Sequence, residues 1–523
     1  MGKLKYILPF LLFASCAQVG VPTGGPKDTE PPVIVSISPA LGATNISTKK
    51  GGAITVMFDE YIDVRQLNTQ LLVSPPLKNP MDWYMKGKEV TFMWEEDLQE
   101  NKTYVFQFGD AVVDVREFNP TIDFVHAFST GNKFDTLSIT GSIVDVFTRE
   151  QMTGKRIFLF DVSCTADSIL NGAIPQFVGT SDKNGSFTLN YLPEGVYKII
   201  AVDDLDRNYK WTAGEPLALI KKLVIINETD TLPAPLLMQE TSNTEVKYFI
   251  SSSRDSLGLV EIQISGVIEG DSRIETQGLE YVLEDEIMWV WAEAKDIENL
   301  QVIWVGQDTL KLVETEESEL VQFIPTNGPE GKQISGTHAS VRFNRPITGV
   351  TDSLITLVIS DSIHSENFTV EVNELNPFVL DIIGSFGRGK VLELSFLPGS
   401  VEGFGEQQLD DTLSFKWSTF ELSELGELSV LIEREGELEL ISSNGEVVEV
   451  KTLLGDRETV LFKNLTPGSY ALRWLGDDNG NGVWDGVSLE NWTTPESARI
   501  MSEKVKVKAD WSHELDWTIR YSQ

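Results

Sequence analysis

The chain has 523 residues and is strongly acidic, with 42 Lys and Arg against 79 Asp and Glu and a formal net charge of −37. This much negative charge repels phosphate backbones and anionic headgroups, which argues against a nucleic-acid partner. Hydrophobic residues make up 41% of the chain, enough for several buried cores. The length predicts roughly four or five domains.

The chain begins MGKLKYILPFLLFASC, which carries the features of an export signal. Two lysines precede the apolar run 6–13, which suits a signal peptide but is too short to span a bilayer as a helix. Small residues then lead to Cys16, and this ending resembles a bacterial lipoprotein signal. The resemblance implies that residues 1–15 are removed and that Cys16 carries lipid. Phe13 departs from the pattern, where Leu is usual; an ordinary cleaved signal with an unrelated Cys is the alternative.

Residues 16–32 are rich in Pro and Gly and poor in large apolar side chains, so we expect a disordered tether. Position 17 is Ala rather than Asp, which in lipoproteins resembling this one favours the outer membrane. The following AQVGV lacks the acidic cluster associated with surface display, which favours the periplasmic face. The second and last cysteine, Cys164, ends the apolar run IFLFDVSC and is interpreted as a small buried hydrophobe.

Short runs of alternating apolar residues dominate the rest of the chain. Examples are AITVMF (53–58), TYVFQF (103–108) and the alternation from Val505 to Trp511. Turn residues bound these runs, and no sustained helical periodicity is found. We therefore predict an all-β chain of tandem β-sandwich domains.

Residues 33–131 resemble the SbsA-type bacterial Ig-like domain. The matching pieces are PPVIVSISPALGATNIS, ITVMFDEYI, KEVTFMWEEDLQENKTYVFQF and HAFSTG. The resemblance implies a β-sandwich that serves as a spacer or interaction module. The alternation places these side chains in a shared core: Phe58, Ile62, Phe92, Trp94, Tyr104, Phe106 and Phe128.

Residues 136–240 resemble the carboxypeptidase regulatory-like, or prealbumin-like, β-sandwich. A turn of the form DKNG precedes a strand, then LPEGVY, in which Pro193 and Gly195 form a tight turn and Tyr197 packs into the core. The resemblance implies a sandwich without peptidase residues.

Both modules recur along the chain. NLTPGSYALRWLGDDNGNGVWDG (464–486) aligns with YLPEGVYKIIAVDDLDRNYKWTAG (191–214). A second Ig-like domain is expected at 331–420 and a second prealbumin-like domain at 425–523. Residues 242–328 form a β-domain that we do not assign. This arrangement is a domain duplication rather than a solenoid.

The recurring segment contains the pattern D-x-[DN]-x-N-x-x-W. Oxygen-bearing side chains at positions 1, 3 and 5 of a turning loop converge as they do at the start of an EF-hand calcium loop. Position 6 of an EF-hand loop is a Gly that allows a sharp turn. The second copy has Gly482 there and the first has Tyr209, so the second copy is the stronger calcium candidate. Position 12 is not acidic in the second copy, so the missing ligand would come from Glu490 or from a residue of another strand. The alternative is an Asx-rich turn that bonds its own backbone. The candidate calcium ligands are Asp477, Asn479, Asn481, the Val483 carbonyl and Asp485, and then Asp204, Asp206, Asn208 and Glu215.

Enzyme signatures are missing from the sequence. The four His are dispersed, and neither a nucleophile elbow nor a phosphate-binding loop is found. Twelve Trp leave carbohydrate binding open, although core packing explains aromatic residues in alternating strands. We therefore expect a non-enzymatic scaffold, spacer or adhesion protein with a protein partner in the envelope. A glycan- or polymer-binding subunit is the alternative, and a hydrolase remains only through a site assembled across domains.

Overall fold

The computed structural model describes residues 28–49, 51–122, 124–240, 249–255, 257–264, 274–275, 279–284, 287–291, 303–305, 308–310, 322–336, 338–359, 368–455 and 457–519. The predicted signal peptide and the lipidation site Cys16 lie outside these residues. By internal contacts the chain divides into two units, and the boundary in the sequence follows Asp135. In the described part, no helix has the length and apolar character needed to cross a membrane.

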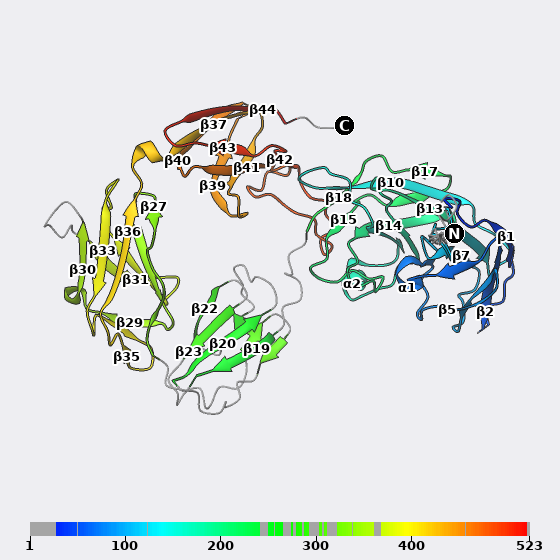
Figure 1. Cartoon of the computed structure of the whole chain (residues 1–523), viewed down its shortest axis with the longest axis horizontal. Helices are drawn as coiled ribbons and strands as arrows, with labels where there is room; N and C mark the ends of the chain where they lie inside the picture. Colours follow the sequence, from blue (N-terminus) through cyan, green and yellow to red (C-terminus); the bar gives the residue numbers. More distant parts are fainter. Residues whose placement is uncertain are drawn as a thin grey trace, which may run out of the picture. The chain divides into compact units, whose positions relative to one another are not determined.

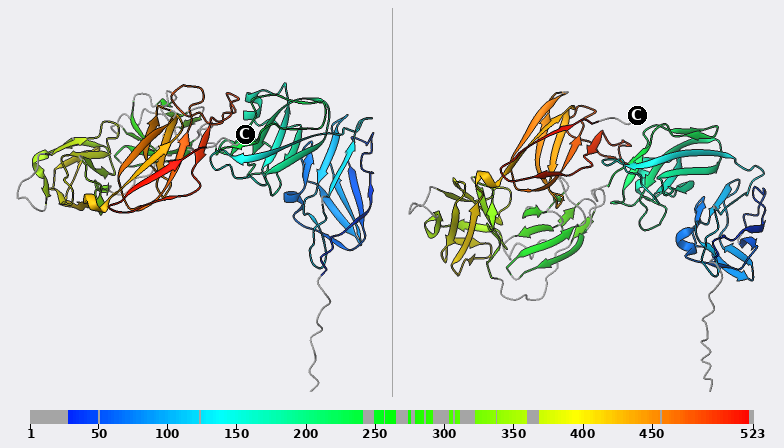
Figure 2. Two further views of the ribbon diagram at one scale, coloured as in Figure 1. Left: turned by 90° about the horizontal axis from the view of Figure 1, so that it is seen from above. Right: turned by 45° about the horizontal axis from the view of Figure 1, so that its top comes forward.

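The first unit contains sandwich I (28–131). One layer has the strand order β1-β2-β6-β5 and the other β4-β7-β9, with β3 and β8 paired beside them. Figure 2 shows these strands in blue. The seven side chains expected in the core are all buried, and they join one cluster. The elements are β1 (Ile34–Ser38), β2 (Gly52–Phe58), β3 (Ile62–Val64), α1 (Leu67–Gln70), β4 (Leu72–Ser74), β5 (Asp82–Lys86), β6 (Glu89–Trp94), β7 (Thr103–Gln107), β8 (Val112–Asp114) and β9 (Val125–Ser129).

Sandwich II (136–240) opens the second unit. Strand β10 pairs with β13, β17 and β18, while the facing sheet runs β12-β11-β14-β15 with β16 also on β14. Alternate residues of these strands fill one core. The elements are β10 (Leu137–Asp145), β11 (Arg156–Asp161), α2 (Ala166–Leu170), β12 (Phe177–Thr180), β13 (Ser186–Leu192), β14 (Gly195–Val202), β15 (Leu217–Leu219), β16 (Val224–Ile226), β17 (Asp230–Thr231) and β18 (Leu236–Met238).

Sandwich IV (425–519) repeats this topology. Strand β37 pairs antiparallel with β40 and parallel with β44, as β10 does with β13 and β17; the facing sheet runs β39-β38-β41-β42 with β43 also on β41. Figure 1 labels β10, β13 and β17 and their counterparts β37, β40 and β44. The elements are β37 (Gly426–Ile432), β38 (Gly436–Ile441), β39 (Val447–Leu453), β40 (Glu458–Leu465), β41 (Gly468–Leu475), β42 (Ala498–Ile500), β43 (Val505–Val507) and β44 (Ser512–Trp517).

The duplicated tyrosines occupy equivalent places. Tyr197 is 4% exposed and Tyr470 5%, and both lie near the start of the strand that carries three partners. Each phenol donates to the carbonyl four residues earlier, at 3.3 Å in sandwich II and 2.8 Å in sandwich IV. The prediction that these two tyrosines are buried at equivalent places is therefore confirmed.

Sandwich III (323–420) has one sheet, β26-β28-β32-β31, in the order of β1-β2-β6-β5 of sandwich I. Its other sheet, β27-β36-β33-β30, has one strand more than β4-β7-β9. Sandwich III begins before the expected position 331, because β26 pairs with β28 and Phe323 belongs to the core. The elements are β26 (Pro325–Asn327), β27 (Lys332–Gln333), β28 (His338–Phe343), β29 (Ile347–Val350), the 3-10 helix η1 (Asp352–Leu354), β30 (Ile355–Ile359), β31 (Thr369–Val372), β32 (Val379–Ile383), β33 (Val391–Phe396), β34 (Val401–Gly403), β35 (Gln407–Gln408) and β36 (Leu413–Thr419); η2 (Leu422–Glu424) follows it.

The unassigned region between sandwiches II and III contains a sheet of order β19-β20-β23-β22 and a smaller one of order β21-β24-β25. Its Trp291 is buried, and Trp289 and Trp291 both pack against Phe378 of sandwich III. These two aromatic residues therefore serve packing. The elements are β19 (Phe249–Arg254), β20 (Leu259–Ile264), β21 (Ile274–Glu275), β22 (Glu280–Glu284), β23 (Ile287–Trp291), β24 (Ile303–Val305) and β25 (Asp308–Leu310).

Two apolar runs extend past the ends of their strands, and the interpretation of Cys164 as a buried residue is wrong. Cys164 is half-buried rather than a core residue, because β11 ends at Asp161 and the thiol lies in the turn that follows. Trp511 is 58% exposed, because β43 ends at Val507 and Asp510 turns with φ 58°. In both cases apolar alternation continues in the sequence past the end of the strand.

Candidate calcium-binding loops

The two candidate loops connect equivalent strands. Loop A (203–216) joins β14 to β15, and loop B (476–497) joins β41 to β42. Val202 and Leu475 are the last paired residues before the loops, and the leading carboxylates Asp204 and Asp477 each follow two residues later. The sheet therefore delivers both carboxylates to the same point of the fold.

In loop A the leading carboxylate organises the turn. Asp204 accepts the backbone N–H of Asn208 at 3.0 Å and that of Tyr209 at 3.3 Å. Glu215, at the far end of the loop, accepts the N–H of Thr212 at 2.9 Å. The two carboxylates thus hold the beginning and the end of the loop together.

Loop B has the same hydrogen-bond pattern. Asp477 accepts the N–H of Asn481 at 3.0 Å and that of Gly482 at 2.7 Å. Glu496 accepts the N–H of Asp485 at 2.9 Å. When the loops are aligned at their leading Asp, the three donors are the same positions as in loop A, so the duplication has kept the loop geometry.

The backbone conformation recurs as well. Gly480 and Gly482 of loop B have φ of 75° and 91°, and the aligned Arg207 and Tyr209 of loop A both have φ of 59°. Non-glycine residues adopt this left-handed region at an energetic cost. The aspartate-centred hydrogen bonds therefore hold loop A in its turn without the glycines that loop B has.

Loop A gathers three carboxylates. Ligand oxygens of Asp204, Asp206 and Glu215 all lie within 4.8 Å of one another. Asp204 is 8% exposed and Glu215 5%. Burial raises the pKa of Asp204, and its hydrogen-bonding contact with Asp206 adds to the rise; burial also raises the pKa of Glu215, with repulsion from both aspartates adding to it. A divalent cation would relieve this repulsion and suits carboxylate oxygen ligands.

Loop B carries less concentrated charge, because Asn479 stands where loop A has Asp206. The carboxylate of Asp485 accepts hydrogen bonds from the side-chain amides of Asn479 at 2.6 Å and Asn481 at 2.8 Å. The sequence ranks loop B ahead on account of Gly482, but a glycine relieves backbone strain and supplies no side-chain ligand. The three carboxylates gathered in loop A therefore make loop A the stronger candidate for a calcium site.

Glu496 is the residue that the sequence interpretation missed. Glu490, expected as the additional ligand, is exposed, whereas Glu496 accepts backbone N–H groups from Asn479 and Asp485 and so closes loop B. Glu215 and Glu496 each stand two residues before the strand that follows their loop. Counting two residues back from the start of the following strand identifies Glu496, whereas counting forward from the leading Asp does not.

The two recurring tryptophans differ in their packing. Trp211 is buried, and its indole N–H donates to the Glu215 carbonyl at 3.1 Å, so it covers the base of loop A. Trp484 is half-buried and packs against Phe147 of sandwich II, with ring centroids 5.5 Å apart.

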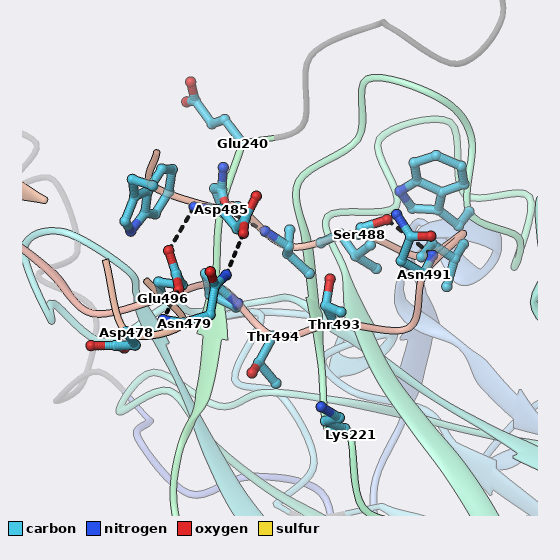
Figure 3. Close-up of a pocket in the computed structure, with 18 residues that line it drawn as sticks. Lys221, Glu240, Asp478, Asn479, Asp485, Ser488, Asn491, Thr493, Thr494 and Glu496 are labelled. Carbon is cyan, nitrogen blue, oxygen red and sulfur yellow. Dashed lines mark hydrogen bonds between the residues drawn. The ribbon is translucent and has the colours of Figure 1, made fainter. Parts of the chain in front are cut away.

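A cavity of about 1020 Å³ lies beside loop B (Figure 3). Its lining comes from both sandwiches of the duplicated fold, including Lys221 and Glu240 of sandwich II and Asp478 of loop B. Figure 3 also shows Asn479 directed toward Asp485 and Glu496 beneath the loop. Four carboxylates and three side-chain amides stand among the lining residues, and such groups suit a cation or a polyhydroxylated molecule.

Residues 28–130 match the model of a family described as bacterial Ig-like domain. The match coincides with sandwich I, so Ig-like β-sandwich architecture is established there; the SbsA-type subclass and the prealbumin-like resemblance of sandwiches II and IV stay predictions. No curated protein sequence matches the chain.

Three similar solved structures share about a tenth of their residues with this chain. The Bacillus anthracis TIE protein is 10% identical over 95% of this chain and 76% of its own, with a TM-score of 0.15. The major pilin subunit BcpA of Bacillus cereus is 10% identical over 74% of this chain and 99% of its own, with a TM-score of 0.15. Domains 1–6 of the surface layer protein SbsC are 10% identical over 91% and 67%, with a TM-score of 0.14. Scores this low carry no argument about function, and the all-β sandwich fold rests on the sheets described above.

Proposed function

We propose that this protein is a non-enzymatic, lipid-anchored component of the bacterial envelope whose β-sandwiches act as a scaffold, spacer or adhesion module, stabilised by calcium at loops A and B. One observation carries the calcium proposal. The same aspartate-centred turn, closed by a glutamate, recurs in both copies of the duplicated fold, and in loop A it brings three carboxylates within 4.8 Å.

The affinity expected of such a site is low. Neither loop has the full ligand set of an EF-hand, so a dissociation constant of about 10⁻⁴–10⁻³ M, typical of extracellular modules, is expected. At roughly 5 mM calcium, mass action then stabilises each loaded sandwich by about 1–2 kcal/mol. This corresponds to a rise of several degrees in melting temperature for domains of about 100 residues.

The test is the melting temperature of the full chain with millimolar calcium, with magnesium and with chelator. Calcium should raise it and magnesium should raise it less, because magnesium demands stricter geometry. Asp204→Ala should abolish the increment of sandwich II, and Asp477→Ala that of sandwich IV. Asp182→Ala is the matched control, because Asp182 also accepts two backbone N–H groups in a turn but lies outside the acidic cluster.

The pH dependence provides an independent check. The raised pKa values of Asp204 and Glu215 mean that the folded, metal-free loop takes up protons before the unfolded chain does. Without metal, the stability of sandwich II should therefore increase as the pH falls through that range, while the calcium increment shrinks because protons compete for the same oxygens. A calcium increment that is absent from the wild type, or unchanged in Asp204→Ala, would leave loop A as an Asx-rich turn.

Lipid anchoring is supported by the signal-like N-terminus that ends at Cys16. Cys16→Ala should block processing, so that the uncleaved precursor accumulates and the outer-membrane fraction loses the mature protein. Unchanged processing and membrane association in this variant would show that an ordinary signal peptide is present. Protease accessibility in intact cells distinguishes the periplasmic face, which the sequence favours, from the cell surface.

Glycan binding is the second candidate, and the cavity beside loop B favours it. Trp211 and Trp484 both line this cavity together with amide and carboxylate side chains. Planar polar groups beside an indole are suited to sugar hydroxyls and ring faces. Binding of envelope polysaccharide that is lost in Trp484→Ala and retained in Trp511→Ala would favour this function over a purely structural one.

A further inference from the structure

Loop B is longer than loop A, and all of the extra chain lies in one place. From the leading Asp to the closing Glu, loop A runs from 204 to 215 and loop B from 477 to 496, so the separations are 11 and 19 residues and the difference is eight. Since Trp484 aligns with Trp211, the additional residues fall between Trp484 and Glu496. We call residues 486–495 the docking arm.

The docking arm is internally ordered. Ser488 and Thr493 form a two-way backbone bridge, with N···O distances of 3.1 and 2.9 Å. Within it, the N–H of Asn491 donates to the Ser488 hydroxyl at 3.1 Å, and Leu489 is 1% exposed. At its root, Glu496 holds the loop through the N–H of Asp485. The arm is therefore a small preorganised hairpin rather than an open excursion of the chain.

The hydrogen bonds that the arm makes outside itself go to sandwich II. The N–H of Val487 donates to the side-chain carbonyl of Gln239 at 2.7 Å, and the indole N–H of Trp492 donates to the Ile220 carbonyl at 3.1 Å. The ammonium group of Lys198 lies 5.6 Å from the Trp492 ring centroid, within cation–π range. Gln239 is 248 residues from Val487 in the sequence, and Ile220 is 272 residues from Trp492.

The receiving surface is itself fixed. Gln239 exchanges two backbone hydrogen bonds with Leu217, at 2.9 and 3.0 Å, which hold its side chain at the edge of β15. Gly486 allows the approach, because a Cβ at this position would lie 2.6 Å from the Gln239 amide nitrogen. The contact therefore depends on an anchored acceptor in sandwich II and a side-chain-free position in the arm.

A second set of contacts accompanies the arm. The N–H of Ile500 donates to the Phe147 carbonyl at 3.2 Å, the Phe147 ring packs on Trp484, and the guanidinium of Arg473 lies 5.1 Å from the Phe147 ring centroid. Loop A shows no counterpart of the arm, so these contacts are a property of the second copy alone.

We propose that the docking arm is an intramolecular clasp whose partner is sandwich II, and that it joins the two copies of the duplicated fold into one unit. The clasp closes residues 241–424 into a loop. Tension applied between sandwich II and the C-terminus is therefore borne first by the clasp, and the unassigned region and sandwich III are loaded only after it opens. This gives the expansion of loop B a role that goes beyond calcium binding.

The test is hydrogen exchange of the full chain, followed by mass spectrometry, in calcium and in chelator. Gln239→Ala should speed exchange of peptides spanning 484–493, more than 240 residues away, by about two- to tenfold, as expected for a lost neutral hydrogen bond. Trp492→Ala should reciprocally speed exchange of peptides spanning 217–222. The proposal requires both effects in either condition, so its outcome is separate from that of the calcium proposal.

Matched controls separate undocking from loss of fold. Gln176→Ala truncates a glutamine of sandwich II whose backbone N–H bonds Leu159 in the same sandwich, and Trp511→Ala removes an exposed indole of sandwich IV. Neither control substitution should change the exchange rates of the peptides spanning 484–493 and 217–222. Strands β11 and β38 should keep their exchange rates in every variant. Unchanged exchange at 484–493 in Gln239→Ala and at 217–222 in Trp492→Ala, or equal effects of the controls, would overturn the clasp.

Discussion

Replacing Tyr470 with Phe removes a single hydroxyl from the buried corner of sandwich IV. The ring is 5% exposed, and the hydroxyl donates to the Thr466 carbonyl at 2.8 Å, with the Thr466 hydroxyl 3.0 Å away. Losing a neutral buried hydrogen bond costs about 0.5–1.5 kcal/mol. Tyr470→Ala removes the ring as well and, like other large aromatic deletions in cores, should cost about 3–5 kcal/mol.

Native-state hydrogen exchange at β41 in the full chain measures both costs, because strand amides exchange through opening of the sandwich. About 1.4 kcal/mol corresponds to a tenfold change, so Tyr470→Phe should accelerate exchange by up to about tenfold and Tyr470→Ala by a hundredfold or more. Strand β14 of sandwich II is the internal control and should be unaffected. Tyr197→Phe should have a smaller effect on its own sandwich, because its hydrogen bond is longer, at 3.3 Å.

Two results would refute this reasoning. If Phe and Ala accelerate exchange equally, the ring does not contribute to the core and only the hydroxyl matters. If neither accelerates exchange, Tyr470 does not occupy the buried corner that the duplicated topology assigns to it.

Three further perturbations test other parts of the molecule. Asp255→Ala leaves the fully buried Arg345 guanidinium without its ion-pair partner, so it should destabilise the second unit by about 3–5 kcal/mol in thermal unfolding. A loss of stability below about 1 kcal/mol would contradict burial of the pair. Burial lowers the pKa of His126 to about 4, so the unfolded chain binds a proton at this residue before the folded chain does. The stability of sandwich I should therefore decrease by on the order of 3 kcal/mol as the pH falls from about 6.5 to 4. His126→Leu should remove this pH dependence. Gly52→Ala should cost roughly 1–3 kcal/mol by overpacking, because the added Cβ would lie 1.9 Å from a ring atom of Trp94, and an unchanged melting temperature would contradict that packing.

The fold class, the core of sandwich I and the equivalence of Tyr197 and Tyr470 can all be predicted from the amino-acid sequence. These follow from the two-residue period of strands and from the LPEGVY-type turn, both of which are local. Local pattern fails where a strand ends, because alternation continues past the last hydrogen-bonded pair, as it does at Cys164 and at Trp511.

The closure of the candidate loops and the contacts of loop B depend on residues that are far apart in the sequence. The closing carboxylate Glu496 is separated from Asp477 by an insertion, so counting forward along an EF-hand pattern points to Glu490 instead. Pairing of β41 with β42 brings Glu496 back to the loop, because antiparallel register aligns the residues next to both strand ends. The contacts of Val487 and Trp492 with sandwich II join residues about 250 positions apart, and no local pattern encodes that distance.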